Sequence, residues 1–332
     1  MALLLLGSAL FADDAKVMPT RVGRLYLSPS FVTGSQAFDK DGDRKDMGNT
    51  VRMFNIGGAI EYGIISWVTG AIQWIPGINV WSEIEPDTGS SKARIFDAGD
   101  IFLGAKLQIL GKEAPVVTDK FRLSFGPGIK IPLPGPDGKK EAENMAKGDA
   151  FTAQSLDRHA FGLGLRSYFD YLVNDNFFIN LYNEFIFYPI KKDLDKTGLV
   201  GYMTSESLKP ADVTGKVDYG YDLTFELEPV FTYPMAQGLQ FSAGLPVNYK
   251  TTPGDKIELS GSDAGLAYLE ATGFNKGGDQ THILSLRPNV SFFFTGWVLP
   301  VDFKLAYFAP IWGKNSGAMH TVNLQIKAYF KI

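Results

Sequence analysis

Apolar and polar side chains alternate along most of the chain after residue 20. The clearest case is the last segment, 319–332, where every second residue from Val322 to Ile332 is apolar and most residues between them are polar. A period of two predicts a β-strand whose two faces meet different surroundings, one apolar and one polar. An amphipathic helix pattern of comparable length does not occur elsewhere in the chain.

The same alternation divides the chain into a series of strands, about twelve in number, which together predict an all-β protein. Between 253 and 280 the pattern permits either additional strands or a short helix, so the count could be ten or fourteen. The strands are predicted at 22–35, 51–64, 68–84, 94–110, 120–134, 158–172, 177–190, 216–234, 239–252, 281–295, 298–312 and 319–332.

The connections between these strands alternate in length. Turns after the second, sixth, eighth and tenth strands are short, whereas most of the others are long and rich in Gly, Asp, Lys, Ser and Thr. Outer-membrane barrels have short periplasmic turns and long external loops, and an even number of strands. The sequence therefore predicts a transmembrane antiparallel up-and-down β-barrel in the bacterial outer membrane. Its long external loops are expected at 36–50, 85–93, 136–157, 191–215 and 253–280.

Two other folds compete with this interpretation. The stretch 62–82 has no charged residue and is long enough for a transmembrane helix, but it contains three glycines and a proline and divides into two strand-like halves. A soluble secreted β-protein would use its apolar faces as an internal core. The barrel is favoured because Phe, Leu and Tyr line one face of every strand, and because a closed sheet leaves no edge to protect.

Composition narrows the function classes. Hydrophobic residues make up 45% of the 332 residues, and 36 glycines suit a barrel of closely spaced strands. The net charge of −4 argues against a nucleic-acid partner, which requires a basic surface. The chain has no cysteine, so disulfides and cysteine-ligated metal sites are excluded. No cofactor is expected.

The first residues have the character of an export signal. A short apolar run with small residues ends at Ala12 and is followed by Asp13 and Asp14. This predicts a signal peptide over 1–12, which lacks the usual basic start and would be truncated. The expected organisation is then a short periplasmic segment, 13–20, followed by one barrel domain over 21–332.

The sequence offers few candidate residues for a catalytic or a metal site. A barrel enzyme acting on lipids would need a histidine close to a serine on one strand face, and the surroundings of His159, His282 and His320 do not provide it. The protein is therefore expected not to be an enzyme. Asp39, Asp41 and Asp43 resemble the start of a calcium loop, but the glycine and glutamate of such a loop are missing, and no metal is expected.

Charged residues on the polar faces predict the character of the lumen. By the alternation, one group of cations and one group of carboxylates point inward from different parts of the ring. This arrangement predicts a basic wall and a neighbouring acidic wall, either across a water-filled pore or as salt-bridged filling of a plugged barrel. The basic wall would consist of Lys106, Arg122, Lys130 and Arg166, and the acidic wall of Asp218, Asp222, Glu226 and Glu228.

Tryptophans mark the expected membrane interfaces. Trp67 and Trp297 fall at predicted periplasmic turns, and Trp81 and Trp312 fall near external strand ends. Tryptophan favours these positions because its ring is apolar and its N–H seeks a polar partner. Trp74 lies in the middle of a strand and does not fit this girdle.

Two strands resemble those of a known group. The segments Asp97–Leu107 and Phe125–Pro132 contain Gly-Asp-x-x-Leu-Gly-x-Lys and Gly-x-Gly-x-Lys-x-Pro. They resemble outer-membrane barrels of the phenol-degradation (MetA-pathway) and FadL-like transporter group, over about forty residues. The resemblance implies a passive channel for hydrophobic or aromatic small molecules. FadL-type channels have an N-terminal hatch, for which this chain has little length before the first strand.

The end of the chain resembles the C-terminal assembly signal of such barrels, which usually has a terminal aromatic residue; here Phe330 lies two residues inside and Ile332 is last. That resemblance implies the barrel-assembly machinery as a partner, besides outer-membrane lipid and a small solute. The expected function is a porin-like passive channel. The alternatives are a structural or host-contact surface barrel with a plugged lumen and, less favoured, a lipid-modifying barrel enzyme. The oligomeric state and the solute stay open.

Overall fold

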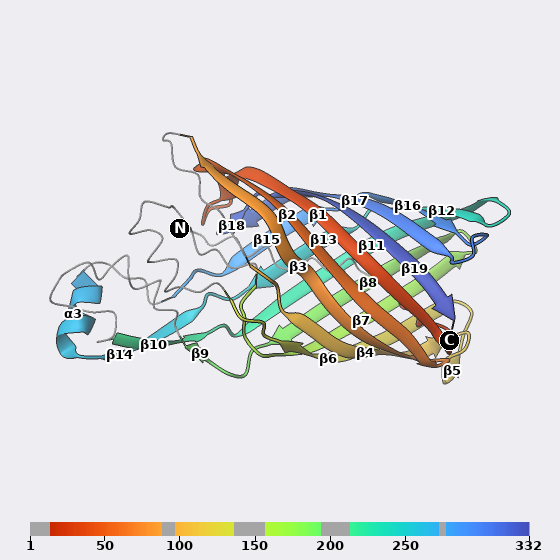
Figure 1. The fold of residues 1–332 in the computed structure, drawn as a ribbon, viewed down its shortest axis with the longest axis horizontal. Helices are drawn as coiled ribbons and strands as arrows, with labels where there is room; N and C mark the ends of the chain where they lie inside the picture. The colour runs from red at the N-terminus through yellow and green to blue at the C-terminus, as the bar shows by residue number, and fades with distance from the viewer. Residues whose placement is uncertain (1–13, 88–96, 136–156, 194–212, 272–276, 332) are drawn as a thin grey trace.

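The computed structural model describes residues 14–87, 97–135, 157–193, 213–271 and 277–331. Within these ranges the chain forms one closed antiparallel barrel (Figure 1). The predicted signal peptide and Ile332 lie outside the described residues, as do most of the predicted loops 136–157 and 191–215.

Twelve strand positions make up the described barrel wall, and two of them consist of two consecutive pieces. The elements are β1 (Val22–Phe38), β2 (Arg44–Ile65), β3 (Val68–Pro86), β4 (Ile101–Gly111), β6 (Phe121–Ile131), β7 (Gly162–Asn174), β8 (Phe177–Phe187), β11 (Tyr221–Ala236), β12 (Leu239–Gly244) with β13 (Val247–Thr252), β15 (Thr281–Leu286) with β16 (Asn289–Phe294), β17 (Val301–Lys314) and β19 (His320–Lys331). The predicted number of strands is confirmed.

The barrel closes between its first and last strands. β1 pairs with β19 from Val22 opposite Lys331 to Thr33 opposite His320, while its other edge pairs with β2. Closure satisfies the backbone groups at both edges, which a membrane-spanning sheet requires because lipid offers no hydrogen-bond partners. Residues 62–82 belong to β2, the following turn and β3, so they do not form the alternative transmembrane helix. The helix of the described chain is too short to cross a membrane.

Proline explains why two wall strands are interrupted. Pro246 separates β12 from β13, and Pro288 separates β16 from β15. Proline has no N–H to donate, so the ladder of backbone hydrogen bonds is interrupted at each proline. The proline carbonyls still accept hydrogen bonds: Arg287 N donates to Pro246 O at 2.9 Å, and Tyr307 N donates to Pro288 O at 3.0 Å. The two breaks lie on adjacent strands, and the pieces on either side of each break stay paired with their neighbours, so the wall remains closed.

Several short elements extend beyond the wall. A small sheet of β14 (Lys256–Gly261), β10 (Val213–Asp218) and β9 (Lys192–Asp193), together with α3 (Asp263–Ala271), projects beyond the long-loop end of the barrel (Figure 1). β5 (Val116–Val117) and β18 (Ser316–Gly317) pair with the wall strands β4 and β1. The long first loop predicted at 36–50 is wrong, because β1 and β2 continue their pairing to a tight turn over 39–43.

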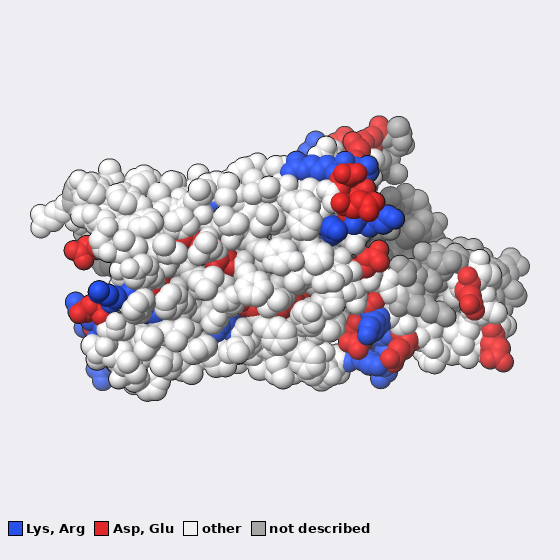
Figure 2. Space-filling model, turned by 180° about the vertical axis from the view of Figure 1, so that it is seen from behind, with Lys and Arg blue, Asp and Glu red and all other residues white. Residues whose placement is uncertain are grey.

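Burial is inverted relative to a soluble protein. Large apolar side chains are exposed on the outside of the wall, for example Leu227 at 49% and Phe225 at 43%, whereas their neighbours Glu226 and Glu228 are buried inside. On the face that Figure 2 draws, most of the surface between the two ends of the wall is uncharged, and charged side chains gather toward the ends. An apolar band of this kind requires lipid around it. The barrel therefore lies in the bacterial outer membrane.

Candidate functional site

The lumen holds the start of the described chain. Residues 14–20 run inside the barrel and join β1 at its short-turn end, where Arg21 N donates to Gly63 O at 2.8 Å. Ala15 is fully buried. Residues 13–20 were expected to form a short periplasmic segment, but the described part, 14–20, lies in the lumen. There the wall side chains supply the hydrogen bonds that water would otherwise give to its backbone.

Four strands hold this segment through its backbone. Ala15 N donates to Asp170 Oδ2 at 3.0 Å, and Ala15 O accepts from Ser124 Oγ at 2.5 Å. Further on, Met18 N donates to Thr69 Oγ1 at 2.7 Å. Lys106 Nζ donates to Asp14 O at 2.9 Å. Because the contacts reach main-chain atoms, the wall recognises a peptide backbone at this position more than particular side chains.

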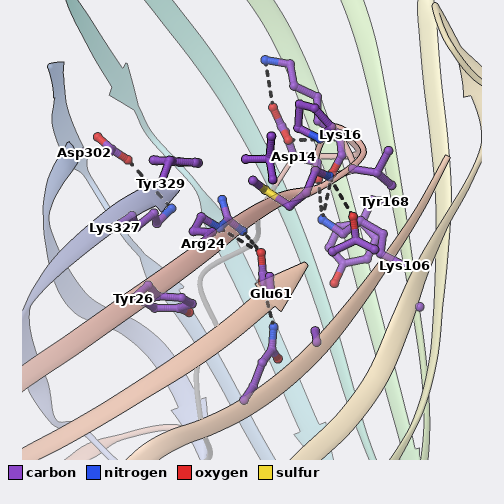
Figure 3. Close-up of a pocket in the computed structure, with 18 of the residues that line it drawn as sticks. Asp14, Lys16, Arg24, Tyr26, Glu61, Lys106, Tyr168, Asp302, Lys327 and Tyr329 are labelled. Atoms are coloured by element: carbon purple, nitrogen blue, oxygen red, sulfur yellow. Dashed lines mark hydrogen bonds and ion pairs between the residues drawn. The ribbon is translucent and has the colours of Figure 1, made fainter. Parts of the chain in front are cut away.

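A cavity of about 480 Å³ remains between this segment and the rest of the wall (Figure 3). Asp14, Lys16 and Lys106 lie on one side of it, and Asp302 and Lys327 lie on the other. Its space arises where small residues occupy inward positions, since Ala71 on β3 faces Gly104 on β4. A volume of this size is typical of a site for a small molecule.

All four cations of the predicted basic wall point into the barrel, and each has a partner. Arg122 Nε lies 2.6 Å from Asp170 Oδ2, and Arg166 Nε donates to Glu184 Oε2 at 2.6 Å. Lys130 forms an ion pair with Asp157 and lies 3.8 Å from Asp100. Lys106 bonds the N-terminal segment and places Nζ 4.0 Å from the centre of the Tyr168 ring.

Three of the four predicted acidic residues line the interior of β11. Asp222 Oδ1 accepts from Arg158 at 3.1 Å and Glu226 Oε2 from Arg287 at 3.0 Å. Glu228 lies 3.9 Å from Lys304. The fourth does not belong to the lumen. Asp218 lies on β10, outside the barrel wall, where it accepts from Gly220 N at 3.1 Å.

The barrel therefore does not contain a separate basic wall and a separate acidic wall. Each of the four predicted basic residues is paired with a carboxylate from a neighbouring strand or with an inward segment. The sequence pattern places a side chain on the inner face, but it does not indicate which residue stands opposite it in the closed ring. Local pairing also follows from physics, because an isolated charge inside a barrel is costly to desolvate.

Two inward segments, 97–100 and 157–159, were not predicted as part of the lumen. They form a buried cluster in the long-loop half of the barrel, around Lys130. His159 lies at its centre, with Nδ1 2.8 Å from Leu133 O and Nε2 3.0 Å from Asp97 Oδ2. The Gly-Asp motif that includes Asp100 was the one sequence signal for this cluster, and it gave no indication of the contact with His159.

His159 is held in its charged form. Burial alone would lower the pKa of the imidazole, but hydrogen bonds and attraction from Asp100 and Asp97 raise that pKa to about 9. A doubly protonated ring can donate from both nitrogens at once, to Leu133 O and to Asp97. The charged ring therefore ties the inward segment 157–159 to the wall.

The four tryptophans assigned to the interface girdle lie toward the two ends of the wall. Trp67 lies in the turn between β2 and β3, and Trp297 lies between β16 and β17, where it stacks on Phe294 at 4.6 Å between ring centres. Trp81 on β3 and Trp312 on β17 are exposed toward the long-loop end. Trp74 faces differently: its Nε1 donates to Gly99 O at 2.8 Å and so holds the inward segment 97–100.

The remaining candidate motifs have structural contacts. Asp39 Oδ1 accepts from the backbone nitrogens of Asp41 and Asp43, both at 2.9 Å, which makes it a turn residue. Among the described residues no group suitable for a metal ion occurs. Phe330 lies on the last strand, β19. His282 Nδ1 lies 2.7 Å from the hydroxyl oxygen of Tyr249, and His320 Nδ1 lies 2.6 Å from the hydroxyl oxygen of Tyr307.

Comparison with solved structures agrees with the architecture. An outer membrane channel from Pseudomonas putida F1 aligns with a TM-score of 0.63 over 97% of this chain and 100% of that chain, at 12% identity. The chain has the fold of an outer-membrane β-barrel. The NanC porin aligns at a TM-score of 0.40 and 7% identity, covering 93% and 100% of the two chains. A FadL homologue from Pseudomonas aeruginosa aligns at 0.37 and 10%, covering 94% and 90%. Neither a family model nor a curated protein matches the sequence.

Proposed function

We propose that this barrel is a passive channel that lets small solutes diffuse across the outer membrane. The observation that carries the proposal is the cavity of about 480 Å³ inside the lumen, lined by charged and hydrogen-bonding side chains. A lumen meant only for structure would be filled by side chains, as in the smallest barrels. Here small residues leave space at the inner face of β3 and β4.

The solutes of such a channel would be small. The N-terminal segment occupies one side of the lumen in the short-turn half, and the cluster around Lys130 and His159 narrows the long-loop half. Both constrictions consist of polar groups fixed by hydrogen bonds. Selection would therefore act through size and through the charges that face the path.

Single-channel recording tests the proposal. The refolded chain is inserted into a planar bilayer, and conductance and ion selectivity are measured for wild type and for Asp222→Asn/Glu226→Gln. We expect discrete openings. The double variant should shift toward anions because Arg158 and Arg287 each lose a charged partner at about 3 Å.

A matched control removes the same number of charges outside the lumen. Asp193→Asn/Asp218→Asn changes two carboxylates of the small sheet β9–β10–β14, so its selectivity should equal that of wild type. Absence of openings from protein that is folded and inserted would exclude the channel. A selectivity shift of equal size in the control would exclude the lumen charges as its cause.

One observation favours a second function, a surface-contact barrel with a plugged lumen. Segments 97–100 and 157–159 are locked to the wall by several buried ion pairs, including Arg158 to Asp222 at 3.1 Å. If these locks never open, the sheet β9–β10–β14 and α3 would carry the function at the cell surface. Membrane-inserted but electrically silent protein is the result that would favour this function over the channel.

A further inference from the structure

We propose that the lumen cavity binds small aromatic carboxylates as they pass. This inference rests on the proposed channel function, since it names the class of solute that the same cavity selects. It is carried by three features of the cavity: its aromatic rings, its excess of cations and its buried polar atoms without partners.

Aromatic rings line the cavity from several strands. Phe293 on β16 lies 5.2 Å from Tyr329 on β19, between ring centres, and Tyr26 on β1 lines the same side. Phe102 and Tyr168 line the opposite side. Phe102 and Tyr168 are buried beneath Arg166 and Lys106, so a flat apolar group would stack on the rings of the first side, where offset stacking adds to the gain from burial.

A cation accompanies each of four of these rings. Lys327 Nζ lies 5.8 Å from the centre of the Tyr26 ring, and the Arg24 guanidinium lies 5.9 Å from that of Tyr329. Across the cavity, Lys106 lies 4.0 Å from Tyr168 and Arg166 lies 3.8 Å from Phe102. A molecule that combines an aromatic ring with a negative group therefore finds both requirements at neighbouring positions.

Charge count favours an anion over a neutral or cationic molecule. Five cations line the cavity, Lys16, Arg24, Lys106, Arg166 and Lys327. Three carboxylates line it, Asp14, Glu61 and Asp302. Glu184, which bonds Arg166 from behind the lining, still leaves cations in excess. The excess sets a positive potential at the cavity.

Two buried side chains present polar atoms without a hydrogen-bond partner. Gln325 is 1% exposed, and neither its Oε1 nor its Nε2 is bonded. Arg166 is 4% exposed, and its Nη2 is unbonded although its Nε bonds Glu184. Both residues line the cavity. Of these atoms, Gln325 Nε2 and Arg166 Nη2 are donors; a buried donor is costly unless something accepts from it, and a carboxylate accepts strongly.

Calorimetric titration of the detergent-folded full chain tests the inference directly. The probes are benzoate, benzyl alcohol, cyclohexanecarboxylate and acetate, so that the ring and the charge are removed in turn. The Kd of benzoate should be lower than that of each of the other probes by a factor of about ten or more. Equal binding of benzyl alcohol or of acetate would overturn the proposal, and this comparison needs no variant.

A charge variant locates the site. Lys327→Met should weaken benzoate binding by about tenfold. Lys304→Met is the matched control, because it also removes one inward positive charge. The two lysines have similar partners: Lys304 lies 3.9 Å from Glu228, and Lys327 lies 4.0 Å from Asp302. Of the two, only Lys327 lines the cavity. Equal weakening in both variants, with both proteins folded by gel migration before boiling, would move the site elsewhere in the lumen and contradict the assignment.

Bilayer recording separates the two proposals. Openings without benzoate binding would leave the channel intact and overturn the aromatic carboxylate as its solute. Benzoate binding without openings would support the site and contradict passage through it. Loss of both would contradict both.

Discussion

Individual charges inside this barrel are held by partners that come from distant parts of the chain. Asp170 is the clearest example: it is fully buried, its carboxylate accepts from Ala15 N at 3.0 Å and from Asn180 Nδ2 at 2.6 Å, and its Oδ2 lies 2.6 Å from Arg122 Nε in an ion pair. It joins the wall, a lumen cation and the N-terminal segment. The alternation along β7 places Asp170 on the inner face, but Ala15 lies 155 residues away in sequence, so no local pattern indicates the contact.

Replacing Asp170 with Asn should destabilise the barrel and loosen the N-terminal segment. The change removes a buried charge from Arg122, and loss of one partner from a buried pair costs about 3–5 kcal/mol. Denaturant unfolding in detergent micelles measures the loss. Asp175→Asn, on the exposed turn of the same hairpin, should change the unfolding free energy by less than about 0.5 kcal/mol. Similar losses in both variants would contradict a special role for Asp170.

The pKa of His159 predicts a dependence on alkaline pH. That pKa is raised to about 9 from an ordinary value of 6.5, so the charged ring stabilises the folded state fully below pH 6.5. The stabilisation is then lost as the pH rises through about 9. Hydrogen exchange at the amides of 157–161 should therefore become faster, beyond its intrinsic pH dependence, between pH 8 and 10. His159→Gln should lack this step, and its persistence in that variant would assign the titration to another group.

At the scale of elements, the N-terminal segment is the part whose position changes the interpretation most. The sequence indicates only a short stretch before the first strand, too short for a hatch by comparison with FadL-type channels. The structure shows that residues 14–20 suffice to occupy one side of the lumen, because four wall strands bond their backbone. For the external segment 253–280 the sequence pattern permits either strands or a short helix. The structure contains both, the strand β14 and the helix α3.

Deleting residues 14–20 should increase single-channel conductance. The deletion empties the side of the lumen that the segment fills, so the narrowest cross-section of the short-turn half widens. Bilayer recording at fixed salt measures the change, and a rise of about twofold or more is expected for a pore limited by this constriction. Deleting 263–271, which removes α3 beyond the barrel, should leave conductance unchanged. An unchanged conductance in the 14–20 deletion would place the narrowest point in the long-loop half.

At the scale of the whole molecule, the barrel is an inside-out protein, with its polar groups enclosed and its apolar groups facing lipid. This property predicts how substitutions depend on depth. Leu227→Arg, in the middle of β11, should cost about 2–4 kcal/mol of unfolding free energy in lipid. Val173→Arg, next to the short turn between β7 and β8, should cost about 0–1 kcal/mol because its charge reaches water. Guanidinium titration in lipid vesicles measures both, and equal costs would contradict the inferred orientation across the bilayer.

The sequence by itself predicted most of the strands, their approximate number, the closed barrel and the side of each strand that faces lipid. These features follow from a period-two pattern within segments of ten to twenty residues, which depends on each residue and its near neighbours. Only the tertiary structure decided that the lumen charges form local pairs, that Asp218 lies outside the wall, and that the N-terminal segment and His159 lie within the lumen. Those contacts depend on strand register and on ring closure, which bring together residues far apart in the chain and leave no periodic trace in the sequence.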